Sequence, residues 1–201
     1  MNAAAETEQA VALSARSVSH HEVTLIVQRV LAGKTNEFAE IVRRYQAKIF
    51  GMALAYTRNT EAAGDLVQDI FLATYESLPR YDQARSFTNW ILKIATHHCY
   101  KFLRRDRRPQ HSEEPQNNLP DPLETALQKE RSERVLAVFH LLNEEMKMVV
   151  WLYYFFDRKC EQIAEILEIS TSLVKVRLFR ARQTMGKALE SEVQDTQDHE
   201  I

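Results

Sequence analysis

The sequence predicts an all-α protein of two small helical domains joined by a flexible linker, the second domain being a helix-turn-helix. Three observations support this prediction. The 201 residues include only four glycines and five prolines, and apolar residues recur at helical spacing along several segments. Four of the five prolines fall between residues 105 and 124, where the helical pattern stops. Beyond that break, residues 160–182 follow the pattern of an amphipathic helix, a tight turn and a basic helix.

Charge and cysteine content limit the possible functions. The formal net charge is −2, yet residues 85–108 carry seven basic side chains and one acid. Local patches of this kind, rather than net charge, govern attraction to nucleic acid. Cys99 and Cys160 have no metal-binding spacing, which favours a reduced, cytoplasmic chain. We find no signal peptide and no apolar run long enough to insert in a membrane.

The first domain is expected over residues 22–108, after a leader of residues 1–21 that has no apolar face and is interpreted as disordered. A short helix over residues 22–32 ends at Gly33, which serves as its C-terminal cap. A second helix is predicted for residues 36–58, because its apolar residues follow the i, i+3, i+4, i+7 template closely.

A third helix, over residues 60–78, begins with Thr60 as the predicted N-terminal cap. Its buried face is expected to hold Leu66, Ile70, Phe71 and Thr74. The outer face carries a compact acidic and amide patch made of Asp65, Gln68 and Asp69. From these residues alone, solvated helix surface is the simpler interpretation of the patch.

A loop over residues 79–86 leads into a long helix over residues 87–105. The helix turns Phe87, Ile91 and Phe102 inward, together with Trp90. Lysine and arginine neutralise phosphates, and aromatic rings stack on unpaired bases, so loop and helix together suit single-stranded or opened DNA. The candidate DNA-binding residues of this segment are Arg80, Tyr81, Arg85, Asn89, Trp90, Lys93, Thr96, Tyr100, Lys101 and Arg104. A core helix with a charged outer face remains the alternative.

No metal and no cofactor are expected. His97, His98 and Cys99 are adjacent, but successive helical residues diverge by about a hundred degrees and cannot all face one ion. The sequence also has no phosphate-binding loop and no nucleophile with a partner base. We therefore expect a protein that is not an enzyme.

The linker is assigned to residues 109–124, the second domain to residues 125–190 and an acidic tail to residues 191–201. In the second domain, a helix that includes Val138 and Leu142 precedes another that starts at Asn143 and ends near Phe156. The run MVVWLYYFF in this helix is apolar nearly all round, which predicts the buried centre of the domain.

The helix-turn-helix closes this domain. Ser170 is the expected N-terminal cap of its second helix, whose inner face holds Val174, Leu178, Ala181, Met185 and Ala188. Such a basic second helix fits the major groove of duplex DNA, although an ordinary helical hairpin has the same pattern. The candidate DNA-binding residues on its outer face are Ser172, Lys175, Val176, Phe179, Arg180 and Gln183.

Two blocks in this order resemble bacterial RNA polymerase sigma factors of the extracytoplasmic-function class, within the sigma-70 family. DLVQDIFLATYESLPRYDQARSFTNWILKIATHHCYKFLRR is similar to the second conserved region, and CEQIAEILEISTSLVKVRLFRAR to the fourth. The resemblance implies that Asp65, Gln68 and Asp69 bind core RNA polymerase. It implies that the loop and long helix open and read the minus-ten promoter element, and that the helix-turn-helix binds the minus-thirty-five element. An anti-sigma factor is the implied regulatory partner.

The chain departs from the family pattern at four positions. Glu168 replaces a usual glycine, so a residue with a Cβ is expected in the left-handed conformation at the turn. His97 replaces an asparagine and Lys101 an aspartate in the long helix. Val176 stands in place of a small polar residue. Because of these changes, the resemblance does not predict which promoter sequence the chain recognises.

Two other functions fit parts of the sequence. A sigma-like decoy would bind an anti-sigma factor without touching DNA, but the basic residues of both blocks argue against it. A plain helix-turn-helix regulator of duplex DNA would have no use for the first block and its acidic patch.

Overall fold

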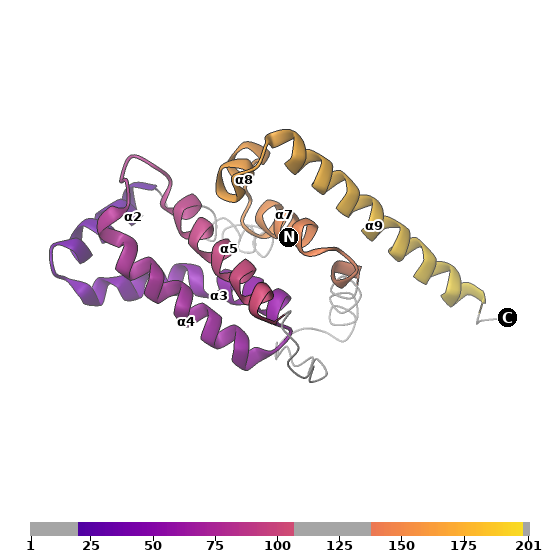
Figure 1. The fold of residues 1–201 in the computed structure, drawn as a ribbon, viewed down its shortest axis with the longest axis horizontal. Coiled ribbons are helices and arrows are strands. Elements are labelled where there is room, and N and C mark those ends of the chain that lie inside the picture. The colour runs from indigo at the N-terminus through magenta and orange to yellow at the C-terminus, as the bar shows by residue number, and fades with distance from the viewer. Residues whose placement is uncertain (1–19, 107–137, 199–201) are drawn as a thin grey trace, which may run out of the picture.

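The computed structural model describes residues 20–106 and 138–198 (Figure 1). The linker over residues 109–124 and most of the leader and of the helix predicted before Asn143 lie outside the described residues. His20 and His21, which the sequence placed in the leader, form the start of the first described helix. The described residues fold into helices connected by turns, with no strand among them, and the predicted all-α fold class is confirmed.

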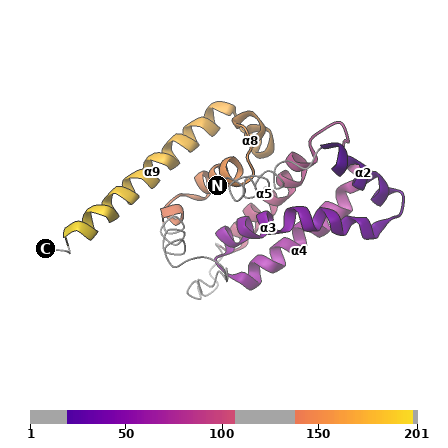
Figure 2. The ribbon, with the colours of Figure 1, turned by 180° about the vertical axis from the view of Figure 1, so that it is seen from behind.

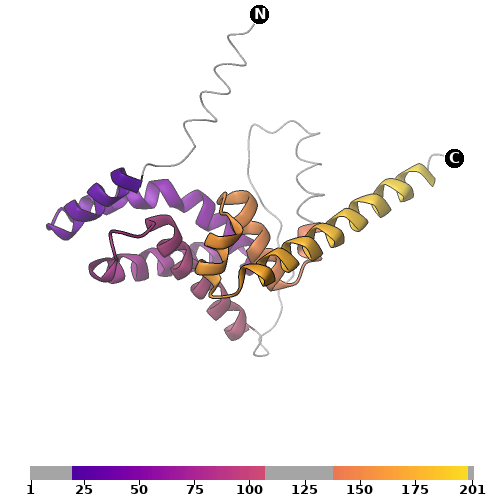
Figure 3. The same cartoon turned by 90° about the horizontal axis from the view of Figure 1, so that it is seen from above.

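The N-terminal unit consists of helices that pack in sequence order. Contacts join α3 to α4 and α4 to α5, and α2 packs across α3 (Figures 1 and 3). The elements are α2 (His20–Leu31), η1 (Thr35–Glu37), α3 (Phe38–Thr57), α4 (Thr60–Ser77), η2 (Leu78–Arg80) and α5 (Phe87–Asp106).

Special backbone conformations separate the helices of this unit. Gly33 has φ +95° two residues after the end of α2, where a residue with a Cβ would be strained. Arg58 ends α3 in the left-handed conformation, with φ 54°. The N-terminal cap of α4 is Asn59, whose side-chain oxygen accepts a hydrogen bond of 2.9 Å from the amide of Ala62. The sequence assigned this cap to Thr60, which instead is the first residue of the helix.

The C-terminal unit begins, within the described residues, at Val138. Asn143 caps α7 as expected, accepting a 2.9 Å hydrogen bond from the amide of Met146. The helix α9 extends beyond the rest of the described molecule in both opposed views (Figures 1 and 2), and it includes the first part of the segment interpreted as an acidic tail. The elements are α7 (Glu144–Val150), η3 (Trp151–Phe155), α8 (Cys160–Leu167) and α9 (Thr171–Asp198).

The two units share one continuous core instead of standing apart. Contacts join α5 to α8, and the hydroxyl of Tyr56 donates a 2.8 Å hydrogen bond to the carbonyl of Glu144. The apolar run of the second domain lies at this junction. Trp151 and Leu152 are buried, whereas Tyr154 and Phe155 are exposed, so the run is buried only in part.

Candidate nucleic-acid and protein interfaces

The outer face of α9 is open to solvent over its first three turns. Ser172, Lys175, Arg180 and Gln183 are exposed, and so are two apolar side chains, Val176 at 42% and Phe179 at 61%. Val174, Leu178 and Ala181 are buried on the opposite face, which fixes the rotation of the helix. The six residues predicted for this face therefore do lie on the surface.

The turn between α8 and α9 has the geometry expected from the sequence. Glu168 adopts the left-handed conformation with φ 55° and ψ 43°. Its neighbour Ile169 donates its amide to the carbonyl of Ala164 at 3.1 Å. Ser170 caps α9 by accepting a 3.2 Å hydrogen bond from the amide of Leu173.

Ion pairing and stacking hold α9 in place. Arg177 bonds Glu145 at 2.5 Å and so ties α9 to α7. Arg182 donates a 2.9 Å hydrogen bond to the hydroxyl of Tyr154, and its guanidinium lies 5.4 Å from the ring centroid of Tyr153. Both arginines are engaged within the unit, whereas Lys175 and Arg180 point outward without a partner among the described residues.

The outer face of α4 presents the predicted acidic patch. Asp65, Gln68 and Asp69 are all exposed, because Leu66 and Ile70 are buried on the other side. One turn further on, Leu72 is 58% exposed and extends the same face. Sequence analysis missed Leu72, although its spacing of three and four residues from Asp69 and Gln68 was the signal that places it there.

The outer face of α5 is only partly as predicted. Lys93, Lys101 and Arg104 of this helix are exposed, as are Arg80 and Arg85 in the segment before it. The side chains of Asn89, Trp90 and Tyr100 are partly buried. This helix contacts α3, α4 and α8, so less of its circumference is free than the sequence implied.

Two residues assigned to DNA are buried, and the outward position expected for Thr96 was wrong. Tyr81 is 6% exposed; its hydroxyl donates to the carbonyl of Arg85, and its ring lies 5.2 Å from that of Phe87. Burial raises the pKa of Tyr81 to about 12. Thr96 is 3% exposed, and its hydroxyl donates a 3.0 Å hydrogen bond to the carbonyl of Lys93.

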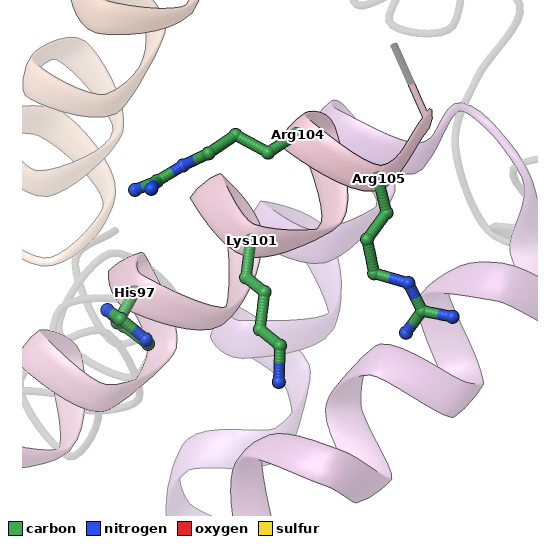
Figure 4. A pocket seen from close by; sticks show the side chains of 4 residues that line it. All are labelled: His97, Lys101, Arg104 and Arg105. Carbon is green, nitrogen blue, oxygen red and sulfur yellow. The ribbon is translucent and has the colours of Figure 1, made fainter. Parts of the chain in front are cut away.

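The C-terminal half of α5 forms a basic hollow of about 320 Å³. Figure 4 shows its lining side chains on successive turns of the helix. Lys101 and Arg104 had been assigned to DNA from the sequence, whereas His97 and Arg105 had not. The lining residues are His97, Lys101, Arg104 and Arg105.

The N-terminal half of the same helix faces carboxylates from α8 and the turn after it. Lys93 Nζ lies 2.5 Å from Glu168 Oε1, and Asn89 Nδ2 lies 3.4 Å from Glu165 Oε2. Arg85 also approaches Glu165, at 4.0 Å. The hydrogen bond from Lys93 lowers the pKa of Glu168 from its ordinary value.

Neither a metal centre nor a membrane span is found in the described ranges. No group of three or more His, Cys, Asp or Glu residues is placed there to hold an ion. The helices in the same ranges are too short or too polar to cross a bilayer.

Comparisons with known proteins match both units. The model of sigma-70 region 2 matches residues 41–109, and that of sigma-70 region 4 matches residues 132–185. The chain belongs to the sigma-70 family of RNA polymerase sigma factors, in its extracytoplasmic-function class, and the resemblance drawn from the two sequence blocks is confirmed.

Individual sigma factors are similar to this chain in sequence or in fold. "Probable RNA polymerase sigma factor RfaY" of Xanthomonas campestris is 30% identical over 85% of this chain, which spans only 44% of that protein. The ECF RNA polymerase sigma-E factor of Escherichia coli is 27% identical, over 83% of this chain and 93% of its own length. The sigma factor RpoE of Bartonella quintana, solved with the anti-sigma factor NepR, has a TM-score of 0.64 at 17% identity. That match covers 77% of this chain and 97% of RpoE.

Proposed function

We propose that this chain binds core RNA polymerase through the outer face of α4 and promoter DNA through α5 and α9. Family membership supports the overall role in transcription initiation. The assignment of surfaces depends mainly on the outer face of α9, the second helix of the helix-turn-helix. On this face, exposed cationic and apolar side chains lie side by side.

The α9 face suits the minus-thirty-five element as duplex. Arg180 and Lys175 are long, unpaired donors of the kind that hydrogen-bond guanine in the major groove. Val176 and Phe179 can meet thymine methyl groups beside them. Ser172 and Gln183, at the edges of the face, are placed for phosphate or base-edge contacts.

The α5 face suits the minus-ten element after strand separation. The cations Arg80, Arg85, Lys93, Lys101 and Arg104 would neutralise backbone phosphates. The partly exposed rings of Trp90 and Tyr100, together with Asn89, would hold unpaired bases. Capture of the opened strand makes melting more favourable. Tyr81 and Thr96 would act by positioning this surface from beneath, since neither is accessible to DNA in this conformation.

The α4 face suits a protein partner. This face offers hydrogen-bond acceptors and a side-chain amide, from Asp65, Gln68 and Asp69. Leu72 adds exposed apolar area beside them. Charged rims around an exposed apolar side chain are usual at protein–protein interfaces. We assign core RNA polymerase to this face.

Regulation by an anti-sigma factor is part of the proposal, supported by the anti-sigma partner of Bartonella RpoE. We further propose that the chain acts in the cytoplasm, carries no cofactor and catalyses no reaction of its own.

Transcription by purified core polymerase on genomic fragments tests this function. We expect the chain to direct discrete start sites that share two upstream elements. Duplex binding without core polymerase dependence would instead identify a plain helix-turn-helix regulator. Absence of both DNA binding and core binding would leave the decoy function.

A further inference from the structure

Two arginines of α9 lie between its buried stripe and its outer face, one on each side. The buried stripe consists of Val174, Leu178 and Ala181. With about 3.6 residues per helical turn, Arg177 and Arg182 fall about 70° to either side of the centre of this stripe. Arg177 bonds Glu145 of α7, whereas Arg182 bonds a tyrosine of η3. Neither arginine is among the six outer-face residues assigned to DNA, so both flanks of the helix are held by polar contacts within the unit.

The turn η3 has an unusual backbone and presents two tyrosines to Arg182. The amide of Phe156 donates a 3.3 Å hydrogen bond to the carbonyl of Trp151, five residues earlier, so the turn is π-helical. Such single turns occur frequently at functional sites. Arg182 donates a 2.9 Å hydrogen bond to the hydroxyl of Tyr154. Its guanidinium lies 5.4 Å from the ring centroid of Tyr153 and 5.8 Å from that of Tyr154. One hydrogen bond and two rings therefore fix the direction of this side chain.

We propose that Arg177 and Arg182 are positioning residues that fix the rotation of α9 about its own axis, and so determine which bases its outer face can read. The inference rests on the proposed function, in which that face lies in the major groove. Hydrophobic burial is non-directional and selects only the side of the helix that turns inward. Hydrogen bonds depend on both distance and angle. The two arginines therefore supply the directional restraint that the apolar stripe lacks.

Base recognition is sensitive to small rotations of the helix. Outer side chains extend about 6 Å from the helix axis, so a rotation of about 20° moves their atoms by about 2 Å. The donor–acceptor distance of a hydrogen bond varies over only about 0.5 Å. Attraction for phosphates depends mainly on charge and is less sensitive to such a movement. Loss of the arginine contacts should therefore reduce discrimination between bases more than the overall affinity for duplex DNA.

The same contacts contribute little to folding. Tyr154 is 55% exposed, and the side chain of Glu145 is 59% exposed. Ion pairs and cation–π contacts at exposed sites are weak. Their removal should leave the melting temperature nearly unchanged while base discrimination falls. This combination separates a positioning role from a structural one.

Two substitutions at exposed positions remove both contacts without altering α9. Tyr154→Phe deletes the hydroxyl that accepts from Arg182, and Glu145→Ala deletes the carboxylate opposite Arg177. The chain is bound to core RNA polymerase, and promoter duplexes with a randomised upstream element are selected and sequenced. We expect the double variant to discriminate about three- to ten-fold less at the most strongly selected base pairs. Its melting temperature, measured by circular dichroism, should match that of the unaltered chain.

Glu161→Ala is the matched control for this variant. Glu161 is an exposed acid in the first turn of α8, as Glu145 is in the first turn of α7. The control should keep the discrimination of the unaltered chain. A folded double variant that discriminates as well as the control would overturn the proposal. Equal weakening for all sequences would also overturn it, because that result would assign the arginines to phosphate binding.

Exchange of the ion pair provides the second test, on the same duplexes. Arg177→Glu alone should reduce base discrimination. Adding Glu145→Arg should restore much of it, because the pair then forms in the opposite sense. Arg177→Glu with Glu161→Arg has the same net charge but no pair, and it should stay impaired. Equal discrimination by the two exchanged proteins would contradict the positioning role.

The proposed function and this inference fail in different ways. An unaltered chain that selects no upstream sequence with core polymerase contradicts the proposed function, and the positioning role with it. A sharp preference that is the same in the unaltered chain, the double variant and both exchanged proteins contradicts only the positioning role.

Discussion

Gly51 of α3 lies against the indole of Trp151, so closely that a Cβ at residue 51 would come within 3.0 Å of Cζ2 and 3.3 Å of Cη2. Trp151 cannot give way easily, because its ring stacks on Phe155 with centroids 4.0 Å apart. This contact joins the two units through their common core. Its geometry makes residue 51 sensitive to a single added methyl group.

Gly51→Ala should weaken the junction of the units. The helix gains about 1 kcal/mol from replacing glycine, but overpacking against the indole costs about 1–3 kcal/mol. We expect a net decrease in unfolding free energy and a changed tryptophan emission, measured by urea titration. Gly64→Ala is the matched control, since nothing lies within 4 Å of its added Cβ; that variant should become more stable. Equal stabilisation of both would contradict the tight contact.

The polymerase surface can be tested without disturbing the fold. Asp65→Lys with Asp69→Lys reverses two exposed charges on α4, so the circular dichroism spectrum should be unchanged while binding to core polymerase weakens at least about ten-fold. Leu72→Ala should weaken binding less, by removing apolar area alone. Glu61→Lys, at the exposed start of the same helix, is the control for charge reversal. A folded double variant with normal core affinity would disprove the assignment.

Substitutions on the two proposed DNA surfaces should impair different steps, duplex recognition for α9 and strand opening for α5. Arg180→Ala is expected to cost about 1–3 kcal/mol in recognition of the upstream duplex if it contacts a base bidentately. Lys93→Ala with Arg104→Ala should spare that recognition and reduce strand opening, seen as weaker permanganate reactivity of thymines near the start site. A pre-melted template should partly rescue only the Lys93/Arg104 variant. Similar rescue of both variants would show that the surfaces are not separate.

The two cysteines should differ sharply in reactivity. Cys99 is fully buried, and burial raises the pKa of its thiol to about 12, so it stays protonated and unreactive between pH 7 and 9. Cys160 is partly exposed. A thiol reagent should therefore modify one cysteine in the native chain and two in urea, and none rapidly in Cys160→Ser. Fast native modification of Cys99 would contradict its burial.

Helical periodicity was sufficient to predict most of the described helices and their faces. The buried positions of α4 and the Val174, Leu178 and Ala181 stripe of α9 were placed correctly, because burial on one side dictates rotation. The left-handed residue at Glu168 was implied by the family resemblance, in which a glycine usually stands at this position. The N-terminal cap of α4 at Asn59 was missed. Asn59 and Thr60 are both good caps, and only the hydrogen bond from the amide of Ala62 to Asn59 distinguishes them.

Contacts between distant segments could not be derived in this way. Periodicity assigned Thr96 to the surface, and Tyr81 was assigned to a DNA-binding loop, yet both donate to nearby carbonyls and are buried. The pairing of Lys93 with Glu168 joins residues 75 positions apart. No local pattern encodes such a contact.

The basic hollow at the end of α5 has a kinetic consequence. His97, Lys101, Arg104 and Arg105 are all exposed, whereas Lys93, nearer the start of the helix, is paired with Glu168. If α5 binds nucleic acid as proposed, this exposed cluster would make the first contacts, and salt would screen its attraction for phosphates. The association rate should then fall as the salt concentration rises.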